Sequence, residues 1–260
     1  DGTPYTVFTP FSRKWRSLPA NGIPLLAPEH LAPLLPLPSL PIPDNPIHPS
    51  GSLFKAGEKE AERRLLAFTD TTIEGYSEVR NRMDREGTSR LSPYLRLGMI
   101  SARQAVWTAR EASQAAGTTM AHSGAETWLN ELIWREFYAS ILYHFPYVRQ
   151  TAFRAELRNI PWRNDLAGLA AWKAGLTGYP VVDAAMRQLN ATGWMHNRAR
   201  MIAASFLTKD LLINWQEGER YFMQQLLDGD PASNNGGWQW TAGTGTDAAP
   251  YFRVFNPILQ

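Results

Sequence analysis

Prolines are concentrated at the start of the chain, and this distribution constrains the fold more than any other feature. Twelve of the nineteen prolines lie within the first 50 of the 260 residues. A proline fixes φ and lacks a backbone N–H, so this spacing forbids helices and interrupts sheets. The Leu-Pro and Ile-Pro pairs over Leu35–Pro43 predict an extended, polyproline-like strap lying against a surface. We therefore expect a proline-rich connector over residues 1–54, with a short strand at Pro4–Phe11.

Helical periodicity begins at Glu58 and continues along the rest of the chain. No strong alternating strand pattern and no internal repeat follows residue 50, and no G-x-G-x-x-G fingerprint follows a strand. We therefore expect a mostly α-helical domain over residues 55–260. Its helices are expected over residues 58–68, 71–83, 92–98, 101–116, 125–145, 165–174, 180–191, 196–213 and 216–227.

The composition excludes several classes of protein. The chain has no cysteine, which rules out disulfides, thiolate metal sites and a cysteine nucleophile, and which fits a reducing cytosol. It has no apolar run of about 18 residues that would span a membrane, and no visible signal peptide. The net charge of +2 does not by itself indicate nucleic acid, although that total would hide a clustered basic face. The histidines His122, His144 and His196 are scattered, so no metal-ligand spacing is present.

The densest mixture of polar and aromatic residues lies at Asp228–Trp240. Within thirteen residues it holds two carboxylates, two adjacent asparagines, an adjacent pair of glycines and two tryptophans. Asp230 followed by Pro231 is typical of a helix N-cap and the first helical residue. The pattern predicts a polar and aromatic pocket at a helix start. A capped turn with a buried pair of tryptophans explains the same residues equally well.

A second candidate lies at Thr88–Pro93, where hydroxyls and an arginine precede a predicted helix. Ser92 suits an N-cap and Pro93 the first helical position. Because a helix N-terminus attracts anions, the segment is a candidate phosphate site. Simple capping is the commoner role for such residues.

A third candidate is the helix around Trp128–Tyr138. Positions 128, 131, 135 and 138 share one face, and apolar residues cover most of the remainder. We expect Glu131 and Arg135 to lie in a pocket or in a buried pair, since charges are scarce there unless they are used. The alternative is an i,i+4 salt bridge on the surface.

The fourth candidate is Gly193–Met201. Asn197, Arg198, Arg200 and Met201 share a helix, and Asn and Arg can hold a phosphate or a base edge through paired hydrogen bonds. His196 is expected to be a satisfied core or capping histidine, and Met201 either core packing or a ligand contact.

No Ser-His-Asp triad or nucleophile elbow is convincing. A single pair of carboxylates this close in sequence does not support acid–base hydrolysis either. The tryptophans Trp162, Trp215 and Trp238 are core residues by default, and their spacing alone does not indicate a relay.

Together, these stretches resemble the flavin-binding helical domain of the photolyase/cryptochrome family, and within it the bacterial class I cyclobutane-pyrimidine-dimer photolyases. The motifs that carry the resemblance are Thr88–Ser92, Trp128–Tyr138, Thr177–Met186, Gly193–Arg200, Asp228–Trp240 and Thr246–Arg253, with Pro4–Phe11 at the start of the chain. The resemblance implies an all-helical FAD-binding domain behind a proline-rich interdomain linker. The N-terminal α/β antenna domain, which binds a folate or deazaflavin chromophore, is expected to be absent, and the C-terminus to be truncated.

The resemblance also implies a role for individual residues toward FAD. The expected cofactor-binding residues are Tyr76, Thr88, Ser89, Arg90, Leu91, Ser92, Trp128, Glu131, Arg135, Asn197, Arg200, Phe222, Asp228, Gly229, Asp230 and Asn234. Asn234 would face flavin N5 and tune the stable redox state. Light-driven electron transfer from reduced FAD would split the dimer, and Trp238, Trp215 and Trp162 would return electrons to the flavin. Glu131 and Asn234 complete the expected catalytic set.

The implied partner is UV-damaged DNA whose pyrimidine dimer is flipped into the flavin pocket. The expected DNA- and dimer-contacting residues are Arg80, Glu131, Trp134, Arg135, Tyr138, Asn197, Arg198, Met201, Trp240, Arg253 and Gln260. The (6-4) photolyases are expected to carry histidines in place of Asn197 and Met201, which favours cyclobutane dimers here. We also expect a monomeric, cytoplasmic bacterial protein without a metal site or membrane segment.

Two other classes of function stay open. One is a cryptochrome-type blue-light sensor that binds FAD and repairs nothing; Asn234 and the intact dimer pocket count against it, because signalling cryptochromes are expected to carry Asp or Cys at that position. The other is a helical nucleic-acid-binding module without a cofactor, in which Asp228 and Asp230 would lie unshielded in a DNA-facing pocket.

Overall fold

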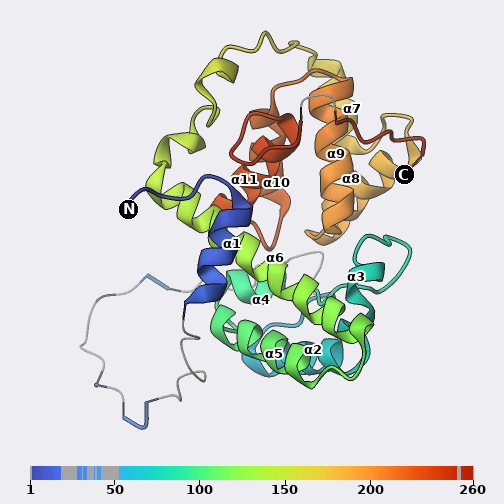
Figure 1. Ribbon diagram of the computed structural model, residues 1–260. Coiled ribbons are helices and arrows are strands. Elements are labelled where there is room, and N and C mark those ends of the chain that lie inside the picture. The colour runs from blue at the N-terminus through green and yellow to red at the C-terminus, as the bar shows by residue number, and fades with distance from the viewer. Residues whose placement is uncertain are drawn as a thin grey trace.

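The computed structural model describes residues 2–18, 28–30, 32–33, 38, 40–41, 53–250 and 253–259. Most of the predicted strap, and Gln260, lie outside these residues. The described chain forms helices and no β-strand (Figure 1). The α-helices are α1 (Phe8–Ser17), α2 (Glu58–Thr71), α3 (Tyr76–Val79), α4 (Ser92–Arg96), α5 (Ala102–Ala115), α6 (Thr119–His144), α7 (Leu166–Ala174), α8 (Pro180–Thr192), α9 (Asn197–Ser205), α10 (Trp215–Gln225) and α11 (Pro231–Ala242). Short helical turns lie at η1 (Ile73–Gly75), η2 (Pro146–Arg149), η3 (Ala155–Leu157) and η4 (Phe206–Asp210).

The predicted strand at Pro4–Phe11 is wrong, because helix α1 begins at Phe8. Pro10 is compatible with that helix, since it lies in the first turn, where a backbone N–H has no partner within the helix. Phe8 and Phe11 lie on one face and pack against the hydrophobic cluster around α6. Burial of this aromatic face therefore outweighs the local extended tendency.

Two other expected helices are interrupted. Residues 71–83 form the end of α2, the 3-10 turn η1 and the single turn α3 rather than one helix. The β-branched run Thr71–Ile73 and Gly75 lower the helical propensity at this point. The predicted helix over 196–213 ends at Ser205 and continues as the π-helical turn η4. There the Thr208 hydroxyl donates to the Ala204 carbonyl at 2.9 Å, a back-bond that competes with regular helix geometry.

Local capping explains most of the helix starts. The Ser101 side chain accepts from the Gln104 N–H, and Asp165 accepts from the Gly168 N–H. Helix α6 starts at Thr119, earlier than the expected residue 125, because Thr118 caps it through the Ala121 N–H. The remaining expected helices, over 58–68, 92–98, 101–116, 165–174, 180–191 and 216–227, are confirmed to within a few residues.

Two hydrophobic clusters divide the helices into two halves, which we call the first half (residues 53–145) and the second half (residues 162–255). The first cluster is formed by α2–α6 and includes Trp128, and the second is formed by α7–α11 and includes Trp172. In Figure 1 the first half lies below and the second half above. Helices α6 and α11 pack together where the halves meet, and the candidate site borders this junction.

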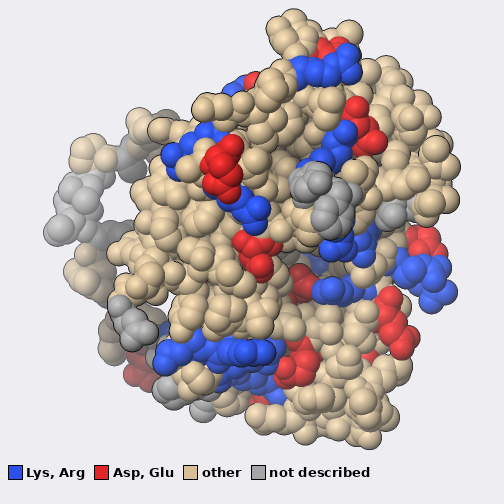
Figure 2. Space-filling model, turned by 45° about the horizontal axis from the view of Figure 1, so that its top comes forward, with Lys and Arg blue, Asp and Glu red and all other residues tan. Residues whose placement is uncertain are grey.

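None of the described helices combines the length and apolar character needed to cross a membrane. Figure 2 shows that basic side chains gather in groups, several of them beside acidic ones. The small net charge of +2 therefore conceals local concentrations of charge.

Candidate functional site

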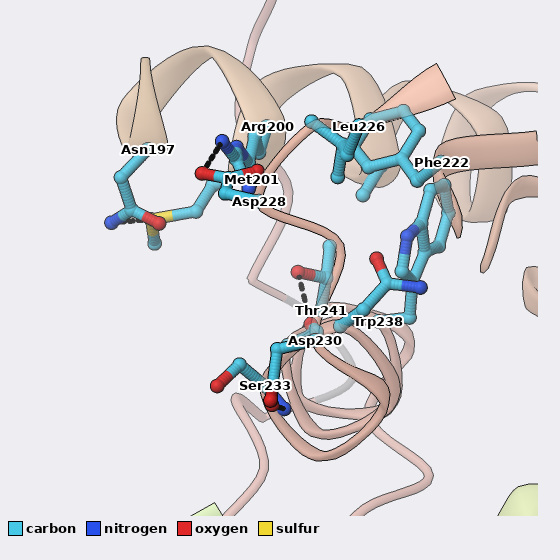
Figure 3. A pocket seen from close by; sticks show the side chains of 13 residues that line it. Asn197, Arg200, Met201, Phe222, Leu226, Asp228, Asp230, Ser233, Trp238 and Thr241 are labelled. Carbon is cyan, nitrogen blue, oxygen red and sulfur yellow. Dashed lines mark hydrogen bonds and ion pairs between the residues drawn. The ribbon is translucent and has the colours of Figure 1, made fainter. Parts of the chain in front are cut away.

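A cavity of about 150 Å³ opens where α9, α10 and α11 meet (Figure 3). Seven residues expected to touch the cofactor or the substrate line it, namely Asn197, Arg200, Met201, Phe222, Asp228, Asp230 and Asn234, and so does Trp238 of the expected electron relay. The other lining residues are Ser233 and Gly237, which lie within the predicted Asp228–Trp240 pocket, and Ala204, Leu226 and Thr241, which no sequence motif indicated. The cavity thus combines charged, amide and aromatic groups from three helices.

Asp228 is the most deeply buried acid of the cavity, with a side chain only 2% exposed. Its Oδ2 accepts a 2.7 Å hydrogen bond from Arg200, whose Nε also donates to the Met195 carbonyl at 2.9 Å. Its Oδ1 is buried and has no partner among the described residues. Because buried polar atoms are nearly always hydrogen-bonded, this oxygen is suited to accept an N–H from a bound ligand.

Asp230 has the role that its sequence predicts. Its side chain accepts from the Ser233 N–H at 2.8 Å, and Pro231 occupies the first turn of α11. The cap and the cavity therefore occur together in this stretch, whereas the expected buried pair of tryptophans is wrong, because Trp238 is buried and Trp240 is only partly buried.

The amide of Asn234 is held by a residue that sequence reasoning missed. Its Nδ2 donates to the Glu219 carbonyl at 3.0 Å and to Glu219 Oε1 at 3.2 Å. This leaves Oδ1 of Asn234 as an acceptor on a residue that lines the cavity. Burial raises the pKa of Glu219, although Asn234 and two arginines oppose that effect. Glu219 lies between Glu217 and Arg220, so its neighbours resemble an ordinary solvated helix face.

His196 caps α9, which was one of its two expected roles. Its Nδ1 accepts a hydrogen bond from the Arg198 N–H at 3.1 Å. The expectation of a fully satisfied histidine is wrong. The residue is buried, and its Nε2 has no partner among the described residues. Burial lowers its pKa, and the charges of Arg198, Arg200 and Arg90 lower it further.

This lowered pKa predicts an acid-sensitive step in stability. The folded protein disfavours protonated His196, whereas the unfolded chain protonates near the ordinary value of 6.5. The stabilising contribution of neutral His196 is therefore fully present above the unfolded-state pKa. It is lost as the pH falls from the unfolded-state pKa toward the lower folded-state pKa. We expect His196→Asn, which keeps a capping acceptor, to reduce the loss in urea midpoint between about pH 7.5 and about pH 5.5. The exposed His144→Asn should leave the wild-type loss in place, and an equal effect of both variants would contradict this assignment.

Glu131 pairs with Arg80, not with Arg135. Arg80 follows α3, and its guanidinium donates to Glu131 Oε1, with both side chains about a third exposed. Glu131 and Arg135 form neither a buried pair nor the alternative surface salt bridge, since tertiary packing brings Arg80 to the carboxylate, and neither residue lines the cavity. Burial raises the pKa of Glu131, and Arg80 counteracts this shift.

The expected aromatic site residues on α3 and α6 do not line this cavity but pack in the first half and at the junction with α11. Trp134 stacks on Phe8 with ring centroids 3.7 Å apart, so one of its faces is covered by α1. Tyr138 packs against Gly236 of α11, where an added Cβ would lie 2.1 Å from the ring. Burial raises the pKa of both Tyr76 and Tyr138. Trp128 is buried in the first cluster, beside Phe68.

Three arginines concentrate positive charge near this junction. Burial lowers the pKa of Arg198, and the charges of Arg80 and Arg253 lower it further. The Arg253 guanidinium also lies 5.8 Å from the Trp240 ring centroid. These three cations are close enough to repel one another, although Arg80 is also paired with Glu131.

The Thr88–Ser92 segment differs from its expected capping geometry. Ser92 lies inside the five-residue helix α4, Leu91 occupies the N-cap position, and no side chain caps the helix. Arg90 adopts a left-handed φ of 50° and places its guanidinium 5.1 Å from the Trp194 ring centroid. Such a φ is costly for a residue with a side chain, so the surrounding contacts must hold it. Thr88 and Ser89 are half-buried and Leu91 is buried.

All three candidate relay tryptophans belong to the second cluster. Trp238 and Trp215 are buried, and Trp162 is partly buried against them. Trp172 was missed, although it is fully buried with its ring centroid 6.0 Å from that of Trp238. Its sequence neighbours, Ala171 and Lys173, gave no sign of this contact. No group of three or more metal-ligating side chains occurs within the described ranges.

Comparison with known proteins adds to this geometry. Residues 128–260 match the family model described as the FAD binding domain of DNA photolyase. The chain is 48% identical to the deoxyribodipyrimidine photo-lyase of Escherichia coli over 267 residues, covering 98% of this chain and 55% of that protein. It is 45% identical to the Synechococcus protein of the same name, covering 100% of this chain and 56% of the relative.

Solved structures give a matching result. A bacterial class III photolyase from Agrobacterium tumefaciens aligns with a TM-score of 0.89 at 40% identity, covering 99% of this chain and 55% of the other. A cryptochrome from Synechocystis aligns with a TM-score of 0.82 at 34% identity, covering 97% and 54%. The chain spans about half the length of the relatives it matches.

Proposed function

Because the chain belongs to the DNA photolyase family, we propose that it is the flavin-binding, catalytic part of an enzyme that repairs UV-damaged DNA in light. The substrate is a cyclobutane pyrimidine dimer flipped out of the duplex. The observation that carries this proposal is the cavity of α9–α11. It presents a buried carboxylate oxygen of Asp228 without a partner and an oriented amide oxygen on Asn234.

The cavity suits FAD because its free acceptors match the N–H groups of a flavin nucleotide. Asp228 and Asn234 would accept from those groups, and Phe222 and Trp238 supply apolar surface. The first half would hold the rest of the nucleotide through Tyr76, the Thr88–Ser92 segment, Trp128 and Arg135. When bound and reduced, FAD supplies the electron that light transfers to the dimer. The protein's own contribution is binding, orientation and exclusion of water.

The dimer would lie beside Glu131, Trp134, Trp240, Asn197 and Met201. Glu131 would hydrogen-bond the bases of the dimer; burial raises the pKa of its carboxyl group, and Arg80 counteracts that shift. Trp134 is half-buried, with Phe8 stacked on its ring and Phe137 and Tyr138 beside it, and would meet the dimer with the part of the ring that stays exposed. Neither Asn197 nor Met201 can donate a proton as an acid. This suits the splitting of a cyclobutane dimer, because no group is transferred between the two bases.

DNA would bind across the basic group formed by Arg80, Arg198 and Arg253. Phosphate contacts from such a group release counterions, so affinity should fall steeply with salt. The buried cluster around Trp238 and Trp215, with Trp162 at its edge, supports a route for electrons from the surface. Monomeric state, cytoplasmic location, the antenna chromophore and the domain boundary at residues 54–55 stay predictions.

The decisive test combines the reduced, FAD-loaded protein with an oligonucleotide that contains a thymine dimer. We expect loss of dimers under blue light and none in the dark, as measured by chromatography of the digested strand. FAD binding without light-dependent repair would favour a blue-light sensor, an alternative supported by the cryptochrome neighbour. A protein that cannot be loaded with FAD would contradict both functions.

Glu131→Gln should lower the repair yield by about ten- to hundredfold while FAD stays bound, because a charge-assisted contact to the dimer is lost. Arg80 would also lose its partner on α6. Glu136→Gln, at an exposed position of the same helix, should repair at the wild-type yield. Flavin absorbance measured after gel filtration checks retention of the cofactor, and its loss in Glu131→Gln would reassign this residue to cofactor binding.

A further inference from the structure

We propose that Arg96 is a positioning residue that fastens the Asp228–Asp230 turn across the junction of the two halves and thereby sets how long the flavin nucleotide stays bound. The Arg96 Nε donates to the Gly229 carbonyl at 2.7 Å, which joins α4 to the loop between α10 and α11. In Figure 1 this loop reaches from the second half down toward α4. The proposal rests on the proposed function, since the nucleotide is the ligand concerned.

Three contacts in three directions hold this short turn. Asp228 bonds to Arg200 on α9, and Asp230 caps α11 through the Ser233 N–H. Both contacts lie within the second half. The Gly229 carbonyl accepts a hydrogen bond from Arg96 on α4, and this contact links the turn to the first half. Without it, both aspartates remain anchored, but the turn is free to move away from α4.

The two halves also meet around the Trp194 ring. In addition to the Arg96 contact, the Arg90 guanidinium lies over the Trp194 ring. The ring centroid of Phe54 lies 6.3 Å from that of Trp194. The Leu227 N–H donates to the Gly193 carbonyl at 2.9 Å, so the loops carrying Trp194 and Gly229 are tied together. A displacement of one loop therefore moves the other, and with it the start of α9 and the cavity residue Asn197.

Arg96 suits this role because it holds a backbone atom and not a ligand. The residue does not line the cavity, and its contact is exposed to solvent. A guanidinium that binds one carbonyl fixes the orientation of that peptide unit, and with it the position of the turn relative to α4. Removing the contact should shorten residence of the nucleotide without changing the groups that touch it.

The experiment uses FAD-loaded protein and measures flavin fluorescence released after dilution. Arg96→Met keeps the apolar stem and removes the donor, and should raise the dissociation rate about three- to tenfold. Arg96→Lys should restore part of the residence time. Arg63→Ala is the matched control, because that exposed arginine bonds only to Glu60 within its own helix among the described residues. The spectrum of the bound flavin should be the same in all variants.

Hydrogen exchange of the unloaded protein gives a second readout. Arg96→Met should speed exchange in the Leu226–Asp230 loop and leave α5 unchanged, whereas Arg63→Ala should change neither. Equal dissociation rates for wild type and Arg96→Met, with the wild type loaded, would overturn the positioning role. Unchanged exchange in the loop would also overturn the positioning role, and this readout does not require bound FAD. Failure of the wild-type protein to bind FAD would count against the proposed function.

Discussion

Asp228→Ala is expected to lower the affinity for FAD by about a hundredfold. The change removes the buried carboxylate whose free Oδ1 is available to a ligand, and Arg200 loses its carboxylate partner while keeping its hydrogen bond to the Met195 carbonyl. Removing one member of a buried pair destabilises a protein by about 3 kcal/mol. Titration of the unloaded protein with FAD, together with a urea unfolding curve, measures both effects.

Two companion variants separate the charge of Asp228 from its shape. Asp228→Asn preserves the volume and one carbonyl acceptor, so its affinity should lie between those of wild type and Asp228→Ala. Asp84→Ala breaks a surface pair in which the Arg82 side chain is 52% exposed and the Asp84 side chain 61% exposed. This control should change neither the affinity for FAD nor the stability measurably. FAD binding by Asp228→Ala at wild-type affinity would remove this residue from the cofactor site.

Gly218→Ala is expected to destabilise the unloaded protein by about 2 kcal/mol, because the new methyl group meets a packed core. An added Cβ would lie 2.1 Å from Trp238 Cη2 and 2.7 Å from Leu207 Cδ2. Both side chains are buried, so neither can turn aside without moving its neighbours. Since Trp238 lines the cavity, its displacement should also weaken FAD binding.

Gly237→Ala is the matched control, since it also lies in a helix next to Trp238. No atom lies within 4 Å of its added Cβ. Its stability should therefore rise by up to about 1 kcal/mol from the better helical propensity of alanine. The methyl group would still occupy part of the cavity that Gly237 lines, so FAD affinity should fall without loss of stability. A urea midpoint for Gly218→Ala at or above that of wild type would refute the steric argument.

Local patterns determined the helical character of this protein and most of its helix starts. Asp230 with Pro231, Ser101 and Asp165 act as caps where their sequence context indicates. These interactions join residues about three positions apart, so the chain specifies them without knowledge of the fold. The same locality explains why residues 228–240 were recognisable as a pocket at a helix start.

Tertiary structure decided which groups meet across long separations. Glu131 pairs with Arg80, 51 positions away, although Arg135 is nearer in sequence. Arg96 reaches Gly229 over 133 positions, and Phe8 joins a helix because its ring stacks on Trp134. Periodicity predicts which face of a helix is buried, but not which partner covers it. The partners depend on how the two halves close on each other, because that closure brings distant charges, carbonyls and rings within contact distance.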